Sequence, residues 1–183
     1  MPTHIVLIRH AEKPLGDTAP HGVNEEGVVD RESLTPRGWQ RAGALVPFLA
    51  GPAGGRGTSG LPLPTHLFAS QVGPRSSSRR PEETIGPLAA RLGLTIDSRF
   101  LKEEIDRLAA AIAAIDGVVL VSWEHHLIPA LANVVLRGSA LVPQIWPDDR
   151  YDVAWILEAN GPSFAFRQLP QELLAGDSDK LIE

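Results

Sequence analysis

The sequence predicts an α/β fold: a three-layer α/β/α sandwich with a mostly parallel sheet and an antiparallel edge. Short apolar runs, typical of buried strands, alternate with segments whose apolar residues recur every three or four positions, as on one face of a helix. Near the C-terminal end, two strand-like runs are separated by the turn signal Asn160-Gly161, which indicates an antiparallel pair. We expect a single domain over residues 1–175 and a frayed tail over residues 176–183.

Composition narrows the class of protein. The chain has 183 residues, of which 43% are hydrophobic and 21% charged, as in ordinary globular proteins. It has no Cys, which excludes disulfides, thiolate catalysis and zinc sites built on Cys. The net charge of −5 disfavours a nucleic-acid partner. No apolar run is long enough for a signal-peptide core or a membrane span, so we expect a cytoplasmic protein with no membrane partner.

The first predicted elements lie between residues 5 and 49. Residues 5–8 form a β-branched apolar run, the pattern of a strand buried on both faces, and the run ends at Arg9-His10. Residues 11–33 are polar and irregular. A helix then begins at Thr35-Pro36, an N-cap followed by proline at the first helical position. Its apolar face consists of Trp39, Ala42, Leu45, Val46 and Leu49.

The middle of the chain predicts two strands and a helix between two loops. Residues 51–64 are rich in Gly and Pro and predict an exposed loop. Residues 66–70 read as a strand and residues 71–79 as a polar loop. A helix begins near Pro81 and ends at Gly93, and a short strand is expected at residues 95–97.

The remaining elements complete the alternation. A strongly amphipathic helix is indicated by the spacing of Leu101, Ile105, Leu108, Ile112 and Ile115. A buried strand at residues 118–121 and a helix over residues 127–135 follow. The last two strands are expected at residues 151–158 and 163–169.

In open α/β sheets, ligands bind beyond the carboxyl ends of the parallel strands. That rule points to Arg9 and His10 after the first strand, Ser70 after the second, and residues 124–126 after the strand at 118–121. A neutral imidazole can attack phosphorus when its other ring nitrogen is held by an acceptor. Arginine supplies a planar fork that matches phosphate oxygens. The pair Arg9-His10 therefore suits phosphoryl transfer to histidine. The alternative is an Arg-His pair on the surface at the end of a strand, with no role in catalysis.

A second anion site is suggested at Arg79-Arg80, because they begin a helix whose free N–H groups and dipole already favour anions. The alternative is a solvated arginine pair in a Ser-rich loop. Of the basic residues of the chain, 14 are Arg and 3 are Lys, which reflects either genomic composition or phosphate binding. Arg75 and Arg79 are candidates for outer contacts to a phosphorylated ligand.

In order and spacing, several segments resemble the histidine phosphatase superfamily, also called phosphoglycerate mutase-like. The similarity covers about residues 3–136 and includes an opening strand with an Arg-His signature, a Leu-Thr-x-x-Gly helix start and a strand that carries a second histidine. The matching segments are IVLIRHAEKP (5–14), LTPRGWQRA (34–42), FAS (68–70), RPEETIGPLAARLGL (80–94) and VVLVSWEHHLIPAL (118–131).

The resemblance implies a role for each matching residue. His10 would attack phosphorus and become a phosphohistidine, while Arg9 and Arg80 would bind the phosphoryl oxygens. His125 would be the second histidine that assists the transition state, with His126 as its rival. No metal and no cofactor is implied.

The resemblance also implies a carboxylic acid that protonates the leaving alcohol and then activates water. Glu103 is the preferred candidate, because Leu101-Lys102-Glu103 matches a Leu-x-Glu pattern of the family. Glu104, Glu124 and Glu12 remain open.

Taken together, the residues and the resemblance predict a phosphomonoester phosphatase whose partner is a small phosphorylated substrate or a phosphopeptide. The alternatives are a phosphomutase and a catalytically weak member that only binds phosphate. The mutase is disfavoured because its sequence context after the acid is missing: from Ile105 onward the chain continues as a helix. The oligomeric state and the substrate stay open.

Overall fold

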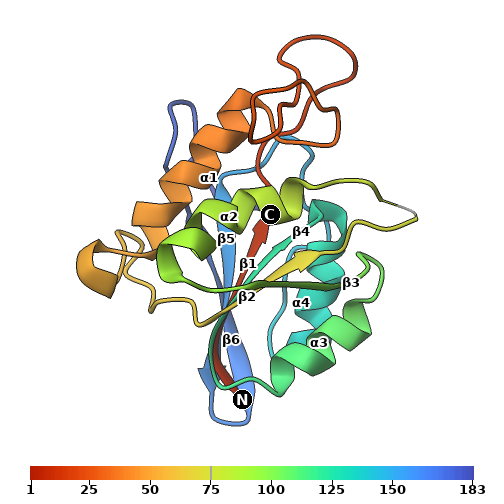
Figure 1. Cartoon of the computed structure of the whole chain (residues 1–183). Coiled ribbons are helices and arrows are strands. Elements are labelled where there is room, and N and C mark those ends of the chain that lie inside the picture. The colour runs from red at the N-terminus through yellow and green to blue at the C-terminus, as the bar shows by residue number, and fades with distance from the viewer. Residues whose placement is uncertain (75) are drawn as a thin grey trace.

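The computed structural model describes residues 1–74 and 76–183 and contains a six-stranded sheet flanked by helices (Figure 1). The strands are β1 (Pro2–Arg9), β2 (His66–Ser70), β3 (Ile96–Phe100), β4 (Gly117–Trp123), β5 (Val153–Asn160) and β6 (Ser163–Pro170). The α-helices are α1 (Pro36–Leu49), α2 (Arg80–Leu92), α3 (Ile105–Ala113) and α4 (Ile128–Leu136). Two short 3₁₀ helices are η1 (Pro52–Gly54) and η2 (His125–Leu127).

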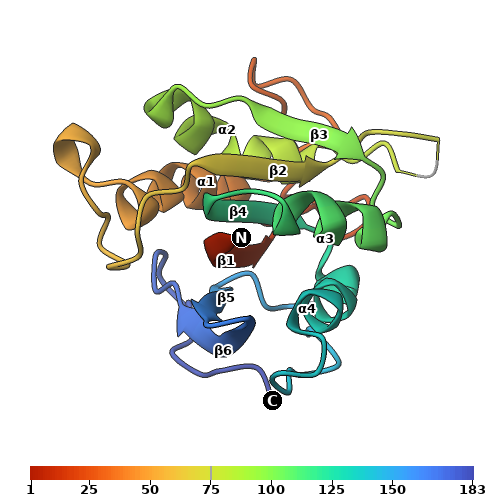
Figure 2. The same cartoon turned by 90° about the horizontal axis from the view of Figure 1, so that it is seen from below.

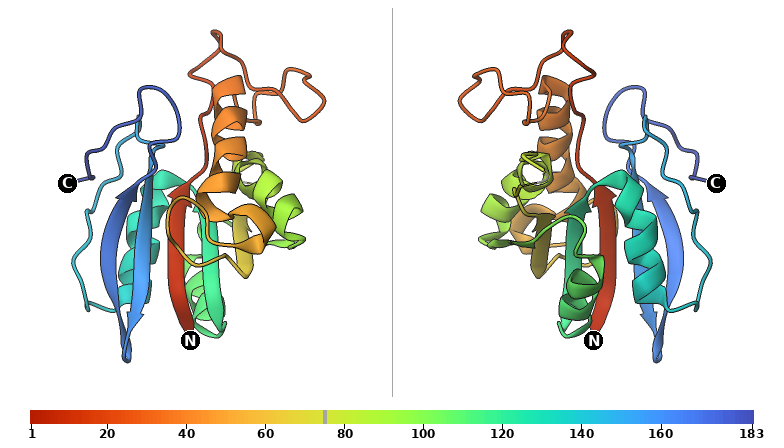
Figure 3. Two further views of the ribbon diagram at one scale, coloured as in Figure 1. Left: turned by 90° about the vertical axis from the view of Figure 1, so that its left-hand side faces the viewer. Right: turned by 90° about the vertical axis from the view of Figure 1, so that its right-hand side faces the viewer.

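The strand order is β3-β2-β4-β1-β5-β6. The first four of these strands run parallel, whereas β5 pairs antiparallel with β1, and β6 antiparallel with β5. Helices α1 and α2 cover one face of the sheet, and α3 and α4 cover the other (Figures 2 and 3). The predicted three-layer sandwich with an antiparallel edge is thereby confirmed.

Strand β1 shows why the central strands read as continuous apolar runs. Ile5 and Leu7 pack into the core on the α3 and α4 side, whereas Val6 and Ile8 pack into the core on the α1 and α2 side. All four are at most 1% exposed. Both faces of β1 therefore need apolar side chains, and the chain becomes polar only where the strand ends.

The predicted helix boundaries at α1 and α2 agree with the structure. The hydroxyl of Thr35 accepts the backbone N–H of Gly38 at 3.2 Å and caps α1, with Pro36 in the first turn. Gly93 ends α2 in the left-handed conformation, with φ of +66°. No helix of the described residues has the length and apolar content needed to cross a membrane.

Helix α3 begins later than the spacing of apolar residues predicts. Residues Leu101 and Glu104 form a turn, in which the N–H of Glu104 donates to the carbonyl of Leu101 and the N–H of Leu101 donates to the Glu104 carboxylate, both at 2.9 Å. This turn satisfies the backbone before Ile105, so the helix starts there. Strand β3 is longer than predicted because it continues to Phe100 alongside β2.

The tail over residues 176–183 packs onto the domain, so the predicted fraying is wrong for it. The side chain of Asp177 is 3% exposed and bonds to Arg41, and Ile182 is 4% exposed in the core on the α3 and α4 side. The N–H of Ile182 donates to the amide oxygen of Gln168 at 2.9 Å. The polar composition of the tail gives no sign of these partners, which come from elements far away in sequence.

Candidate active site

The site lies where the neighbouring parallel strands β1 and β4 end. Arg9 pairs in register with Trp123, and the backbone N–H of His10 donates to the carbonyl of Trp123 at 3.0 Å. The residues that follow each strand are therefore held side by side. This register brings His10 and His125 to the same edge of the sheet, as the strand-end rule predicts.

His10 is held in the form that a nucleophile requires. Its ring is 4% exposed, and Nδ1 lies 2.8 Å from the carbonyl oxygen of Ala11, to which it donates. That bond leaves the lone pair on Nε2. Burial, followed by repulsion from Arg9 and Arg80, lowers the pKa of His10 to about 3, so the ring is neutral at physiological pH.

His10 borders a polar cavity of about 560 Å³. Among the described residues, the cavity lining carries three permanent cations, Lys13, Arg80 and Lys102, against the two carboxylates Glu32 and Glu124. An excess of cations suits a phosphorylated ligand. The lining residues are His10, Lys13, Glu32, Gly73, Pro74, Ser76, Ser77, Ser78, Arg80, Lys102, Glu124, His125 and His126.

Arg80 is the first residue of α2, and its guanidinium group is fixed by neighbouring oxygens. Nε and Nη2 donate to the carbonyl oxygens of Ser33 and Arg31, at 3.3 and 2.5 Å. Nη1 donates to the hydroxyl of Ser78 at 3.1 Å. These carbonyl and hydroxyl partners are uncharged, and a carboxylate oxygen of Glu32 lies 3.7 Å from Nη2. The structure thus places Arg80 in the cavity beside His10.

Arg9 is 1% exposed and lies behind the cavity rather than in its lining. Its Nη1 donates to the carbonyl oxygens of three residues of one turn: Pro147 at 3.3 Å, Asp148 at 2.6 Å and Arg150 at 3.1 Å. Nε and Nη2 are buried without a partner in the described part of the chain. A buried cation with two free donors is costly unless an anion binds it.

The two candidate second histidines differ in environment, although both border the cavity. His125 is buried, and its Nε2 lies 2.5 Å from the Asp148 carboxylate. The side chain of His126 is 57% exposed and lies 3.4 Å from Glu124. The geometry favours His125, because its ring is held by Asp148 and borders the same cavity as His10.

Solved structures with the same architecture decide the fold. One is the proposed phosphohistidine phosphatase SixA from Agrobacterium tumefaciens, at 16% identity and a TM-score of 0.52, covering 92% of this chain and 97% of that chain. Another is a mycobacterial glucosyl-3-phosphoglycerate phosphatase. Its native structure matches at 16% identity and a TM-score of 0.50, covering 92% and 97% of the two chains. Its complex with VO3 matches at 17% identity and a TM-score of 0.51, covering 92% and 98%.

The chain has the histidine phosphatase fold. This confirms the fold that the sequence resemblance implies. No protein-family model matches the chain, and no curated protein matches it in sequence.

Within this histidine phosphatase fold, the preferred acid Glu103 lies outside the cavity lining. Glu103 is exposed and does not border the cavity, so its assignment is not supported, because a proton donor must reach the reacting oxygen. Glu104 bonds to Arg107 and to the N–H of Leu101. Glu12 bonds to Arg41.

Glu124 is the carboxylate among the four candidates that borders the cavity. Its oxygens lie 3.1 Å from Nζ of Lys102 and 3.4 Å from Nε2 of His126. The side chain is 12% exposed. Glu124 is therefore the candidate that the geometry favours for proton transfer.

Two other predicted site residues, Ser70 and Arg79, lie outside the lining of this cavity. Ser70 is 3% exposed and does not border the cavity. The side chain of Arg79 is 61% exposed, lies 3.9 Å from Asp30 and borders a different cavity. Arg75, the other predicted outer contact, lies outside the described residues.

Sequence reasoning missed several residues around the site. Lys13 and Lys102 border the cavity, and the ring of Tyr151 lies 3.7 Å from the guanidinium carbon of Arg9. Lys13 is close to the Arg-His signature, which was a signal available in the sequence. Nothing in the sequence links Tyr151 to Arg9, because the turn before β5 meets β1 only in the folded chain.

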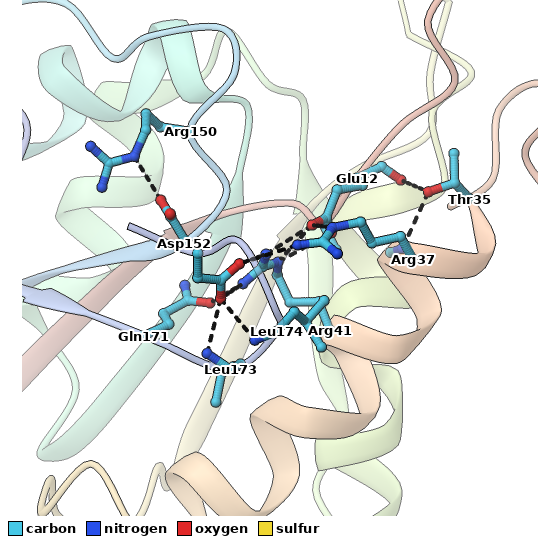
Figure 4. A network of polar contacts seen from close by, with 12 residues as sticks. Glu12, Thr35, Arg37, Arg41, Arg150, Asp152, Gln171, Leu173 and Leu174 are labelled. Atoms are coloured by element: carbon cyan, nitrogen blue, oxygen red, sulfur yellow. Dashed lines mark hydrogen bonds and ion pairs between the residues drawn. The ribbon is translucent and has the colours of Figure 1, made fainter. Parts of the chain in front are cut away.

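A buried ionic network supports the strand end that carries His10 (Figure 4). Arg41 of α1 bonds to Glu12 at 2.8 Å and to Asp177 of the tail at 2.7 Å, and each of these side chains is at most 12% exposed. Arg37 reaches the same two carboxylates from the surface. The network thus ties the residues just after His10 to α1 and to the C-terminal tail.

No group of three or more His, Cys, Asp or Glu side chains that could hold a metal ion occurs over residues 1–74 and 76–183. The metal independence of the chemistry stays a prediction.

Proposed function

We propose that the chain is a phosphatase of the histidine phosphatase superfamily and hydrolyses a phosphomonoester through a phosphohistidine on His10. One observation carries the proposal: His10 is a buried, neutral imidazole whose Nδ1 donates to Ala11, so that Nε2 is free at a cavity rich in cations. Histidine fixed in this way is an activated nucleophile.

In the first step, Nε2 of His10 attacks phosphorus, the new N–P bond forms, and the bond from phosphorus to the leaving oxygen breaks. Arg80 and the free donors of Arg9 stabilise the charge on the phosphoryl oxygens, and His125 adds a further donor. The leaving oxygen takes a proton from the carboxyl group of Glu124, which borders the cavity, and departs as an alcohol.

In the second step, a water oxygen attacks phosphorus, the N–P bond breaks, and phosphate and free His10 are formed. Glu124, which borders the cavity, accepts the proton of that water. The contact with Nζ of Lys102, at 3.1 Å, orients this carboxylate.

The substrate class follows from the cavity and from its neighbours. A space of about 560 Å³ admits a small phosphorylated metabolite or the side chain of a phosphopeptide. The structural neighbours are described as acting on phosphohistidine and on glucosyl-3-phosphoglycerate. Both descriptions agree with a phosphatase rather than a mutase.

A second candidate is a phosphoramidate phosphatase, with phosphohistidine as an example of its substrate. The observation that favours it is the likeness to a structure described as a phosphohistidine phosphatase. The leaving group of a phosphoramidate departs as a neutral amine or imidazole once its nitrogen is protonated. Comparison of aryl, alkyl and phosphoramidate substrates decides between the two: a rate that falls steeply for alkyl esters favours the phosphoramidate.

The experiment that tests the proposal measures turnover of para-nitrophenyl phosphate, with and without a metal chelator, by the parent protein and by His10→Ala. We expect turnover that survives the chelator and is lost in His10→Ala, together with an acid-labile phosphoprotein after a rapid quench. Turnover that survives His10→Ala would overturn the mechanism. Binding of vanadate without turnover of any phosphate ester would favour a phosphate-binding module, and transfer between phosphoglycerates would favour a mutase.

A further inference from the structure

Asp148 contacts both His125 and Arg9. Its carboxylate oxygen Oδ1 lies 2.5 Å from Nε2 of His125. Its backbone carbonyl accepts Nη1 of Arg9 at 2.6 Å. One residue of a surface turn thus touches two of the groups expected to bind the phosphoryl oxygens.

The turn that carries Asp148 is anchored in the core. The N–H of Arg150 donates to the carbonyl of Pro147 at 3.2 Å and closes the turn. Trp146, which is 2% exposed, donates from Nε1 to the carbonyl of Arg150 at 2.9 Å. The backbone of Asp148 is therefore fixed, although its side chain is 95% exposed.

We propose that Asp148 is a positioning residue for His125: its carboxylate accepts the Nε2 proton, fixes the ring, and favours the doubly protonated form whose Nδ1–H is free for a phosphoryl oxygen. This inference rests on the proposed phosphatase function and adds a residue to its machinery. In the neutral ring a proton on Nε2 leaves Nδ1 without one, so only the charged ring satisfies both Asp148 and the phosphoryl group.

The electrostatic surroundings agree with that role. Burial lowers the pKa of His125 and Arg9 lowers it further, whereas the hydrogen bond and charge of Asp148 oppose both. Without Asp148, burial and the neighbouring cations would lower the pKa of His125 further. Among the described residues, the titratable groups that face His125 or share its cavity are Arg9 of β1, His10 just after it, Lys13, Glu32, Arg80 of α2, Lys102, Glu124, His126 of η2 and Asp148 itself.

The test compares Asp148→Asn with Asp149→Asn in the full chain. Asp149 is the next residue of the same turn and makes no ion pair in the described part of the chain, so it controls for a change of surface charge. We expect Asp148→Asn to lower kcat/KM for para-nitrophenyl phosphate by about two- to fivefold at neutral pH, as for the loss of an exposed ion pair. The alkaline limb of its pH profile moves to lower pH, because the charged ring is lost earlier as pH rises. Asp148→Glu restores most of the loss, and Asp149→Asn keeps the parental profile.

A second measurement does not depend on turnover. NMR titration of the His125 ring in the resting protein is expected to move to lower pH in Asp148→Asn and to stay unchanged in Asp149→Asn. An unmoved titration, or an equal and pH-independent loss of activity in both variants, would overturn the role of Asp148. Absence of turnover in the parent protein would instead overturn the proposed function, while the titration would still decide whether Asp148 controls His125.

Discussion

The backbone N–H of Ala11 donates a 2.8 Å hydrogen bond to the hydroxyl oxygen of Thr84. The same hydroxyl donates to the carbonyl of Arg80 at 2.6 Å. Both Ala11 and Thr84 are fully buried. A single side chain therefore sets the distance between the residue after His10 and the first turn of the helix that carries Arg80.

Replacement of Thr84 by Val should disturb that distance. The variant keeps the shape of the side chain but leaves the N–H of Ala11 buried without an acceptor, which costs about 1–3 kcal/mol of stability. We expect kcat/KM to fall about ten- to a hundredfold, because Arg80, the proposed phosphate ligand, is displaced. Thr84→Ser, measured by the same kinetics and thermal melts, should keep most of both; equal losses in the two variants would argue against the bridge.

The position of the carboxylates predicts which one transfers protons. Glu124→Gln should lower kcat by about a hundredfold or more, since positioned acid–base groups contribute on that scale. Glu103→Gln, which alters an exposed residue outside the cavity, should leave steady-state kinetics near those of the parent. The reverse order of effects would return the role to Glu103.

His10 makes the free energy of unfolding depend on pH in the acid range. The pKa of His10 is about 3 in the folded state against an ordinary value of 6.5, so below pH 6.5 the unfolded chain binds a proton that the folded chain rejects. Stability is therefore full above pH 6.5 and is lost progressively as the pH falls toward 3. At about pH 5 the loss amounts to about 2 kcal/mol.

His10→Gln, which removes this ionisation, should lose less stability than the parent between neutral and acid pH in urea titrations. His21→Gln, at an exposed histidine, provides the matched control and should follow the parent. If all three proteins lost the same stability on acidification, the ring of His10 would not be buried in neutral form.

Removal of Arg41 tests the network beneath the site. Arg41→Ala leaves Glu12 and Asp177 buried without their main partner, and the loss of one member of a buried ion pair costs about 3–5 kcal/mol. Arg37→Ala removes a half-exposed partner of the same carboxylates and should cost at most about 1 kcal/mol. Similar melting temperatures for the two variants would contradict the conclusion that Arg41 is the main partner of Glu12 and Asp177.

Much of the fold follows from local patterns in the sequence. Both faces of β1 are buried, which demands an unbroken apolar run, and Thr35 and Gly93 mark helix ends by chemistry that depends on near neighbours. The strand-end rule also places His10 and His125 together, because it depends only on strand order and direction.

The parts that could not be predicted depend on distant contacts. Glu103 and Glu124 are both acidic residues after strands, and only the folded turn before α3 shows that Glu103 lies outside the cavity. The tail appeared unstructured because its key residue, Asp177, is polar and finds its partner on α1. Asp148 is likewise an ordinary turn residue until the fold brings it to His125.

The glycine of the Leu-Thr-x-x-Gly segment has a physical explanation in the structure. A Cβ atom added to Gly38 would lie 2.6 Å from the carbonyl oxygen of Glu12, a clash with the backbone. Gly38 therefore lets α1 approach the segment that follows His10, and the hydroxyl and N–H of Thr35 bond to that same carbonyl.

Strand β1 comes first in the chain, yet it lies between β4 and β5 in the sheet. During synthesis on the ribosome, its apolar residues must wait for residues 117–160 before both edges of the strand are paired. Such pairing is non-local, which slows folding and leaves an aggregation-prone apolar segment exposed in the nascent chain. His10 thus leaves the ribosome before the strands that flank β1, so no fragment that ends before residue 117 can carry a finished site.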